Sequence, residues 1–500
     1  MKICLLPIDS RPCTSVLPQQ LAAIRGIELI SPPRSLLGYF KQPSQQKEVA
    51  KWLAKACVQC DAAVISIEQL LYGGLIASRQ NIHSLEECLR ALEQLRIIKK
   101  AHPNLKIFAN NILMRTTISA VSEKSFKWWK QVSEFSRLKY EVAMSEDMQN
   151  SSAYSTELKK IQSQIPEEVL EQYLTARRRN RKINRACLEL AHENIFEQLL
   201  ILQEDCSERG IQQLEQKELE TAITNLKLEH KVFLHNGTDE AGMEQVLTAA
   251  LSKRQMKIQV IWLYDNTNFM AKYEDRPFGQ NLASHMRAMN ITPQENAKDC
   301  LFILPPVDIQ GDYCPKRICF KDFTPEQRSK MAEKIVTFVR QGYRCFLLDL
   351  AYANGGDPAF MQCLAQMMPL TKLFGYASWN TASNSLGTII GQIAASRGEN
   401  SVANQRFTAE RILDDLIYQS TVRQEAERRI LDAGLDMWGF TGTDTAQQII
   451  DESFTKNRPL IVGLFGGRMP RFAATLYWPR TFELEIRVLE PLDKEIEEIL

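Results

Sequence analysis

Residues 232–240, VFLHNGTDE, decide the fold class, because a short apolar run ends abruptly in a polar, glycine-containing tip. The same rhythm of apolar run, polar tip and amphipathic helix recurs along the chain, for example at residues 3–25 and 62–79. This alternation is typical of βα units that build a parallel sheet. The apolar runs are continuous rather than alternating, which indicates strands covered on both faces.

The spacing of these units predicts an α/β protein made of two or three doubly wound (Rossmann- or flavodoxin-like) parallel-sheet units. A (β/α)8 barrel with insertions is the alternative arrangement. We expect an N-terminal α/β domain at residues 1–120, a helical insertion at 121–196, a second α/β unit at 197–295 and a C-terminal α/β unit at 296–500. Within the last unit, the apolar run 460–464 is interpreted as one more strand.

The composition of the chain argues against nucleic acid and membranes as partners. The chain has 61 basic and 60 acidic residues in 500, a net charge of +1, so nothing favours nucleic acid or an anionic membrane. The strongest basic run, ARRRNRK at 176–182, is interpreted as a solvated helix face rather than a phosphate site. No apolar stretch approaches the ~18 residues of a membrane span, and the N-terminus lacks a signal-peptide core. Twelve scattered cysteines fit free thiols, so a cytoplasmic location is expected.

Several common cofactor motifs are missing. The chain has neither a P-loop nor a G-x-G-x-x-G segment, and no two of its six histidines have H-x-H or H-x-x-x-H spacing. A G-x-S-x-G nucleophile elbow is absent as well. We therefore expect no cofactor and no metal ligands, and we look for chemistry among carboxylates, amides and arginines.

The tip at residues 235–240, HNGTDE, carries the strongest catalytic signal. Two adjacent carboxyls at a strand end can divide roles, because burial and a charged neighbour raise the pKa of one of them. Glu240 is the predicted proton donor, Asp239 orients the substrate, and Asp205 at the end of another strand is the candidate partner carboxylate. Acidic capping of a helix N-terminus is the structural alternative.

Polar residues at the other tips are candidate substrate contacts, because ligands of parallel sheets bind beyond the carboxyl ends of the strands. Carboxylates, amides, arginines and an exposed tryptophan suit a hydroxyl-rich ligand such as a sugar. A structural salt bridge, a plain turn or a helix cap is the alternative at several of these positions. The candidates are Asp9, Arg11, Glu68, Tyr72, Arg79, Asn111, Asp265, Glu274, Asp275, Arg276, Asp349, Asn354, Trp379, Asn380 and Asn384.

A polar helix face is predicted at residues 411–423, which carries charged and amide side chains at i, i+3, i+4, i+7, i+8 and i+12. It faces either a cleft or a partner, or it is simply solvated.

The HNGTDE tip resembles the H-x-G-G-D-E motif of family 20 glycoside hydrolases, with Thr238 in place of a glycine. The resemblance implies that Glu240 is the general acid and that Asp239 positions the acetamido group of the substrate as internal nucleophile.

The chain as a whole resembles a bacterial family catalogued as domain of unknown function 4127. Ser10 and Glu68 stand where that family more usually has aspartate. The segments that carry the resemblance are PIDSRP (7–12), SIEQLLYGGLIASR (66–79), QED (203–205), GTDE (237–240), YEDRP (273–277), DLAYANGGD (349–357), WNTASNSLG (379–387), RILDDLIYQ (411–419) and PRTFE (479–483).

These observations predict a carbohydrate-active enzyme, a glycoside hydrolase acting on an N-acetylamino sugar. A divalent-metal-dependent sugar isomerase or lyase and a non-catalytic sugar-binding protein are the alternatives. The expected partner is a small-molecule substrate, with neither nucleic acid nor membrane. The helical region 121–196 is a possible surface for homo-oligomers.

Overall fold

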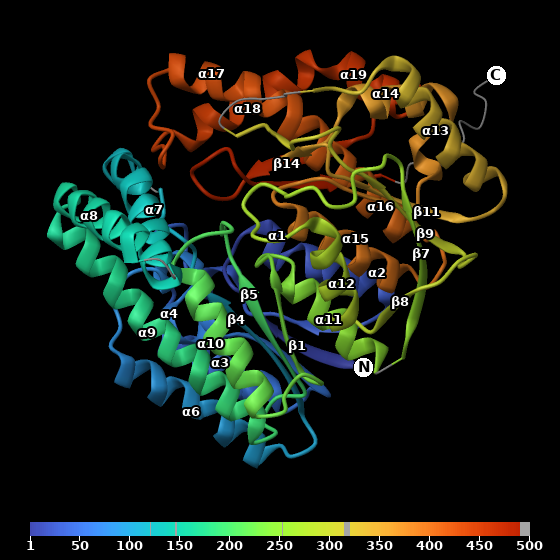
Figure 1. The fold of residues 1–500 in the computed structure, drawn as a ribbon. Coiled ribbons are helices and arrows are strands. Elements are labelled where there is room, and N and C mark those ends of the chain that lie inside the picture. The colour runs from blue at the N-terminus through green and yellow to red at the C-terminus, as the bar shows by residue number, and fades with distance from the viewer. Residues whose placement is uncertain (121, 146–147, 253, 315–320, 491–500) are drawn as a thin grey trace, which may run out of the picture. The chain divides into compact units, whose positions relative to one another are not determined.

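The computed structural model describes residues 1–120, 122–145, 148–252, 254–314 and 321–490 (Figure 1). The chain divides into two compact units that are not consecutive in sequence. The first unit comprises Met1–Ser10, Ile27–Ala250 and Tyr273–Arg276. The second comprises Arg11–Gly26, Leu251–Lys272 and Pro277–Leu500.

A parallel sheet of six described strands forms the centre of the first unit, in the order β2-β1-β3-β4-β5-β6. The order of its first five strands, 2-1-3-4-5, is that of flavodoxin-like folds, with a topological switch point between β1 and β3. The strands are β1 (Lys2–Leu6), β2 (Glu28–Ile30), β3 (Ala62–Ser66), β4 (Lys106–Leu113), β5 (Gln198–Gln203) and β6 (Val232–Asn236).

Helices cover this sheet because its apolar strands must be buried on both faces. Helices α3, α6, α9 and α10 share one apolar core with β1, β3, β4, β5 and β6, and α9 packs between α6 and α10 (Figure 1). A smaller core joins α7, α8 and the first half of α9. The helices of this unit are η1 (Arg34–Leu36), α3 (Gln46–Cys57), α4 (Ile67–Tyr72), α5 (Leu75–Ser78), α6 (Leu85–Ala101), α7 (Glu123–Met144), α8 (Met148–Gln164), α9 (Glu167–His192), α10 (Ile211–Asn225) and α11 (Ala241–Leu251).

The second unit has its own parallel sheet, with five described strands in the order β13-β11-β9-β7-β8. In chain order this is again 2-1-3-4-5, so both sheets follow the same winding rule. Two short ladders accompany the sheet, β10 with β12 and the antiparallel pair β14 with β15. The strands are β7 (Met256–Trp262), β8 (Ile291–Pro293), β9 (Asp299–Leu304), β10 (Gly311–Asp312), β11 (Arg344–Asp349), β12 (Tyr352–Ala353), β13 (Gly375–Ala377), β14 (Phe472–Leu476) and β15 (Leu484–Val488).

The helices of the second unit pack around a core that includes β7, β9 and β11. Sequence signals mark several of their starts, such as the capping box of Thr324 and Gln327 at α13. They are α1 (Pro12–Ser15), α2 (Leu17–Arg25), α12 (Phe278–Ala288), α13 (Pro325–Arg340), α14 (Pro358–Met367), η2 (Leu370–Lys372), α15 (Ala382–Ser396), α16 (Val402–Arg411), the π-helix η3 (Ile412–Val422), α17 (Arg423–Asp432), α18 (Thr443–Lys456) and α19 (Arg458–Leu464).

The expectation of parallel-sheet units is confirmed, and no closed barrel occurs among the strands that the structure describes. The strand predicted at 460–464 is wrong, because these residues belong to helix α19. A five-residue apolar run fits a buried strand or a buried helix equally well, and here Pro459 at the first turn starts a helix.

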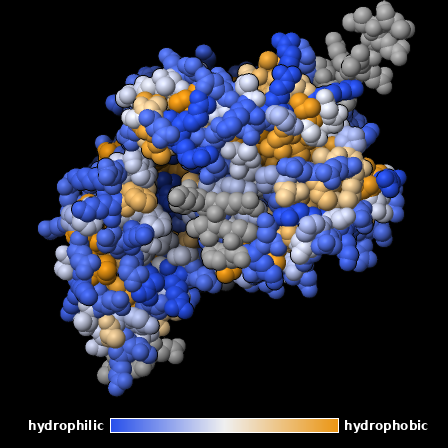
Figure 2. Space-filling model, turned by 90° about the horizontal axis from the view of Figure 1, so that it is seen from above, coloured by the Kyte–Doolittle hydropathy of each residue, from blue (hydrophilic) through white to orange (hydrophobic). Residues whose placement is uncertain are grey.

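None of the described helices combines the length and the apolar character that a bilayer span requires. Hydrophilic side chains cover most of the face shown in Figure 2, with apolar side chains in smaller groups between them. The cysteines in the described part of the chain are free thiols, as expected.

Candidate functional site

Glu240 follows β6 on a short loop whose Gly237 has a φ of 114°, a conformation that favours glycine. Its side chain is completely buried. One carboxyl oxygen, Oε2, accepts a hydrogen bond of 2.9 Å from the backbone N–H of Thr238, whereas Oε1 has no hydrogen-bond partner among the described residues. Burial, together with the charges of Glu244 and Asp239, raises the pKa of Glu240 well above its usual range. Burial and these two neighbouring charges therefore favour the protonated form of Glu240.

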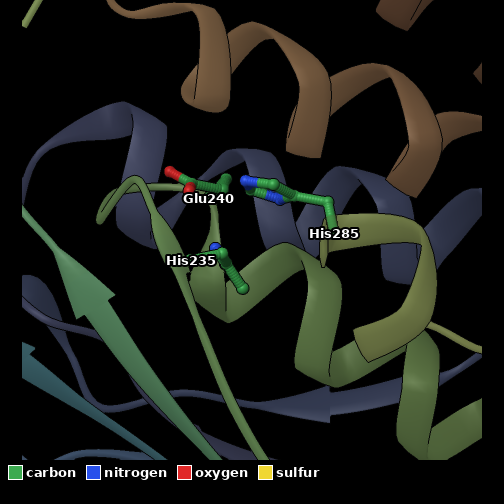
Figure 3. Close-up of side chains that lie close together, drawn as sticks. All are labelled: His235, Glu240 and His285. Atoms are coloured by element: carbon green, nitrogen blue, oxygen red, sulfur yellow. The ribbon is translucent and has the colours of Figure 1, made fainter. Parts of the chain in front are cut away.

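Two further titratable side chains accompany Glu240 in the first unit. His235, at the end of β6, is shown in Figure 3 together with Glu240. Its Nδ1 lies 2.7 Å from the carbonyl oxygen of Asn236, and its Nε2 lies 3.7 Å from Oε2 of Glu244. Burial raises the pKa of Glu244 to about 7, and the neighbouring His235 partly offsets this. A ring nitrogen of His235 also lies within 4.8 Å of a carboxyl oxygen of Glu240. His285, which Figure 3 also labels, belongs to α12 of the second unit.

Glu244 was not anticipated from the sequence. The available signal was its spacing, because it lies four residues after Glu240, one helical turn along the chain at the start of α11. Its charge is one of the causes that raise the pKa of Glu240.

Glu68 is the second buried acid of this unit, on the first turn of α4 directly after β3. Its Oε1 accepts two hydrogen bonds of 2.8 Å, from Asn111 Nδ2 and from the backbone N–H of Ile112. Its Oε2 has no hydrogen-bond partner in the described part of the chain. Burial is the largest cause that raises the pKa of Glu68 to about 7. Asn184 of α9 donates to Oδ1 of Asn111 at 2.6 Å and so fixes the amide that holds Glu68.

The glycine pair after α4 adopts positive φ angles, 85° at Gly73 and 129° at Gly74. A Cβ on Gly73 would lie 2.8 Å from the backbone nitrogen of Ser44, which only glycine avoids. A Cβ on Gly74 would lie 3.6 Å from the carbonyl oxygen of Ile8 and 3.9 Å from Cβ of Asp9. The pair therefore brings the tip of β3 against the tip of β1, at the switch point of the sheet.

Two predicted substrate contacts, Tyr72 and Arg79, and the predicted catalytic partner Asp205 contact other side chains of the first unit. Tyr72 is buried in the core, with the guanidinium of Arg179 4.3 Å from its ring centre. Arg79 forms an ion pair with Glu204 and donates to Ser119 Oγ at 2.7 Å. Asp205 forms an ion pair with Arg115.

The segment Tyr273–Arg276 lies at the tips of β5 and β6. The carboxylate of Asp275 accepts hydrogen bonds from the amides of Gln203 (2.7 Å) and Asn236 (2.8 Å), and Arg276 Nε approaches it at 3.2 Å. The backbone N–H of Cys206 also donates to Tyr273 at 2.9 Å. The structure thus brings the predicted Glu274, Asp275 and Arg276 to the strand ends that precede Asp205 and Glu240.

In the second unit, Asp349 ends β11 and is completely buried. Its Oδ2 accepts from the backbone N–H of Asp357 (2.7 Å) and the hydroxyl of Tyr376 (3.2 Å), and its Oδ1 accepts from the N–H of Ala351 (3.2 Å). Burial and the charge of Asp357 raise the pKa of Asp349 to about 7. A Cβ on Gly356 would lie only 2.6 Å from Oδ2, so glycine is needed in this loop.

The remaining candidates of the second unit surround the tips of β11 and β13. Asn354 has a φ of 60°, donates from Nδ2 to Asp312 at 2.9 Å, and its backbone N–H donates to the carbonyl of Asn380 at 2.9 Å. Asn384 is a buried residue in the first turn of α15. Arg11 belongs to this unit, 3.7 Å from Glu483, whereas Asp9 belongs to the first. Asp265 is exposed in the loop after β7.

The expectation of an exposed tryptophan at residue 379 is wrong. Trp379 is 5% exposed, and its ring centre lies 5.4 Å from that of Phe482. The aromatic ring therefore lies in the interior, packed against the ring of Phe482.

The solvated interpretation of residues 411–423 is also wrong. This segment forms the π-helix η3, and its polar side chains are buried. Arg411 donates to Asp415 at 2.8 Å and to Asp414 at 3.1 Å, and Ser378 donates its backbone N–H to the second oxygen of Asp415 at 3.0 Å. Burial raises the pKa of Asp414 to about 7. The polar face therefore ties the helix to the tip of β13 rather than to solvent.

A family model described as protein of unknown function, DUF4127, matches residues 3–487. The chain belongs to the DUF4127 family. The match confirms the resemblance seen in the sequence, and it covers both sheets of this DUF4127 protein and every motif quoted above. A comparison with curated proteins finds no match for this family member.

Proposed function

We propose that this DUF4127 protein is a carbohydrate-active enzyme, a glycoside hydrolase acting on an N-acetylamino sugar, with Glu240 as its general acid. The observation that carries the proposal is the state of one carboxyl group. Glu240 is buried and its pKa is raised, the backbone N–H of Thr238 donates to Oε2, and Oε1 has no hydrogen-bond partner among the described residues. A positioned acid whose pKa is raised by burial is what protonation of a leaving group requires.

In the proposed reaction, Glu240 transfers its proton to the glycosidic oxygen as the bond to the anomeric carbon breaks, so the leaving group departs as a neutral alcohol. Asp239, next to it on the loop, orients the acetamido group whose carbonyl oxygen attacks the anomeric carbon, as the resemblance to family 20 glycoside hydrolases implies. Glu244 keeps the proton on Glu240 until a substrate arrives, because a neighbouring negative charge disfavours ionisation.

The polar residues at neighbouring tips support a hydroxyl-rich substrate. Glu68 offers a second carboxyl oxygen that has no hydrogen-bond partner in the described residues, and the adjoining tips supply further carboxylates and an arginine. Such groups bind sugar hydroxyls through directional hydrogen bonds.

One observation favours a second candidate, a divalent-metal-dependent sugar enzyme. Imidazole nitrogen and carboxylate oxygen are both common ligands of Zn²⁺, and His235 and Glu240 bring one of each within 4.8 Å. General acid catalysis is the leading proposal, because burial raises the pKa of Glu240 and a raised pKa is what a proton donor needs.

The test is a screen of the purified protein against chromogenic glycosides, N-acetylhexosaminides included, with and without EDTA. We expect turnover that EDTA does not affect and that Glu240→Gln abolishes. Glu410→Gln is a matched control, because Glu410 is another buried acid. The side-chain amide of Gln20 donates to Glu410 at 2.6 Å, and a rotated Gln20 amide could accept a hydrogen bond from the new glutamine.

Full activity in Glu240→Gln would overturn the assignment of the acid. Turnover that EDTA abolishes would replace it with the metal-dependent candidate. Thermal stabilisation by the same sugars without turnover on any substrate would instead indicate a binding protein.

A further inference from the structure

A basic groove runs between α9 and α10 on the first unit, with a volume of about 810 Å³. Five cationic side chains and a single carboxylate, Glu218, line it. The cations are Arg178, Arg181, Lys182, Arg185 and Lys217.

The basic run at 176–182 is divided by the helix into two halves with different roles. Arg177 and Arg179 are buried: Arg177 pairs with Glu215 at 2.6 Å, and Arg179 donates to the carbonyl oxygen of Ser78 at 2.6 Å. These two arginines therefore hold α9 to the rest of the unit. The remaining basic residues of the run point into the groove, so the solvated face expected from the sequence is only part of the run.

The groove cations are crowded on one helix face. Arg178, Arg181, Lys182 and Arg185 are spaced at i, i+3, i+4 and i+7, and like charges at these spacings destabilise a helix. Arg178 pairs with Glu171 at 2.9 Å and Arg181 pairs with Glu218 at 2.6 Å.

The other cations of the groove keep their charge uncompensated. Among the described residues, no ion pair neutralises Lys182, Arg185 or Lys217. The groove therefore has an excess of positive charge for which the described protein provides no counter-charge.

We propose that this groove is a binding site for a small anion that carries two or more phosphate groups, such as a nucleoside polyphosphate or a doubly phosphorylated sugar. Guanidinium groups bind phosphate oxygens in a bidentate manner, and lysine adds a point charge. Glu218 and Thr221, at the same groove, can receive the hydroxyl or amino groups of the non-phosphate part.

Size and charge favour a small ligand over nucleic acid. A volume of about 810 Å³ lies within the range of small-molecule sites. Nucleic-acid surfaces are extended and belong to strongly basic domains, whereas this chain has a net charge of +1. The proposal concerns a site on the outer helices and does not depend on the role of Glu240.

The test uses the full chain and inorganic tripolyphosphate as the probe, with binding measured by titration calorimetry. We expect saturable binding of tripolyphosphate that weakens with added salt. Sodium sulfate at the same ionic strength, titrated in place of tripolyphosphate, should give no saturable binding. The double variant Arg181→Gln/Arg185→Gln should weaken it roughly a hundredfold, because two charge-assisted contacts are lost.

Lys51→Gln/Arg90→Gln is the matched control, since it removes two cations from the same unit at side chains that are 72% and 66% exposed. It should leave tripolyphosphate affinity unchanged, and circular dichroism should show that both double variants are folded. Equal weakening in both variants, or no saturable binding in the wild type, would overturn the proposal. Binding of a single-stranded oligonucleotide without binding of tripolyphosphate would also overturn it, in favour of nucleic acid.

Discussion

The two units share one strand order and differ in how their buried acids are used. The first five strands of the six-stranded sheet and the five strands of the second sheet run 2-1-3-4-5 in chain order, and both sheets have carboxyl groups at the tips with raised pKa values. In the first unit, Glu68 and Glu240 each have one oxygen held by N–H donors and one without a hydrogen-bond partner among the described residues.

In the second unit, both oxygens of four buried acids at or near the tips accept hydrogen bonds. This holds for Asp349, Asp357, Asp414 and Asp415. A raised pKa alone therefore does not identify a catalytic acid. Burial raises the pKa of carboxyl groups in both units. However, only a carboxyl with an oxygen outside the internal hydrogen bonds can donate a proton to a ligand, or accept one from it, without breaking those bonds.

Activity should show the largest difference between the units. Glu240→Gln is expected to lower kcat about 10²- to 10⁴-fold, the usual contribution of a general acid. Asp357→Asn in the second unit keeps an N-cap side chain for α14 and should change kcat by less than about tenfold. Steady-state kinetics on the best substrate of the screen compares them. Equal losses in both variants would remove the distinction drawn here.

The stability of the first unit should depend on pH through the ionisation of Glu68, whose Oε1 accepts hydrogen bonds and whose Oε2 has no hydrogen-bond partner among the described residues. The pKa of Glu68 is about 7 in the folded protein and near 4.5 when unfolded. Below pH 4.5 both states are protonated, and as pH rises toward 7 only the unfolded state ionises, so stability is lost over this window. Glu68→Gln cannot ionise, and its advantage over the wild type should grow by about 3 kcal/mol from pH 4.5 to 7. Calorimetric unfolding at several pH values measures this, and a constant difference would contradict it.

Asp349→Asn should lower the stability of the second unit, whereas Glu68→Gln should not lower the stability of the first unit. At pH 4.5 both carboxyls are protonated in the folded state, so ionisation plays little part in the comparison. In the wild type, a backbone N–H donates to each carboxyl oxygen of Asp349. Asparagine replaces one of these oxygens with an NH2 group, so two donors face each other, which costs about 1–3 kcal/mol of stability. Denaturant unfolding of the two variants at this pH is the measurement, and similar stability would show that the second oxygen of Asp349 is dispensable.

The smallest effect distinguishes two buried tyrosines. Tyr376 donates its hydroxyl to Asp349 at 3.2 Å, so Tyr376→Phe should cost about 1 kcal/mol. The hydroxyl of Tyr72 has no hydrogen-bond partner among the described residues, so Tyr72→Phe should be neutral or slightly stabilising. Thermal unfolding of both variants decides this, and a larger loss in Tyr72→Phe would reveal a partner for its hydroxyl.

Local sequence predicted the parallel sheets and most of their strands. An apolar run followed by a polar tip is a local pattern, so it can be recognised without knowledge of the tertiary contacts. It failed where the signal was ambiguous or long-range. Residues 460–464 are too short a run to separate helix from strand. Helix η3 looked amphipathic on an α-helical wheel, but its polar residues bond to the tip of β13, which lies more than 30 residues earlier.

The sequence by itself determined which residues stand at the strand tips, including Glu240, Asp239 and Glu68, because a strand end is a local event. Only the tertiary structure decided which of the tip acids retain an unused oxygen. Glu68 receives its hydrogen bonds from residues 43 and 44 positions away, and Asp349 receives one from Tyr376, 27 positions away. Hydrogen-bond saturation depends on groups that folding brings together from distant segments, and a pattern of residues along the chain does not contain that information.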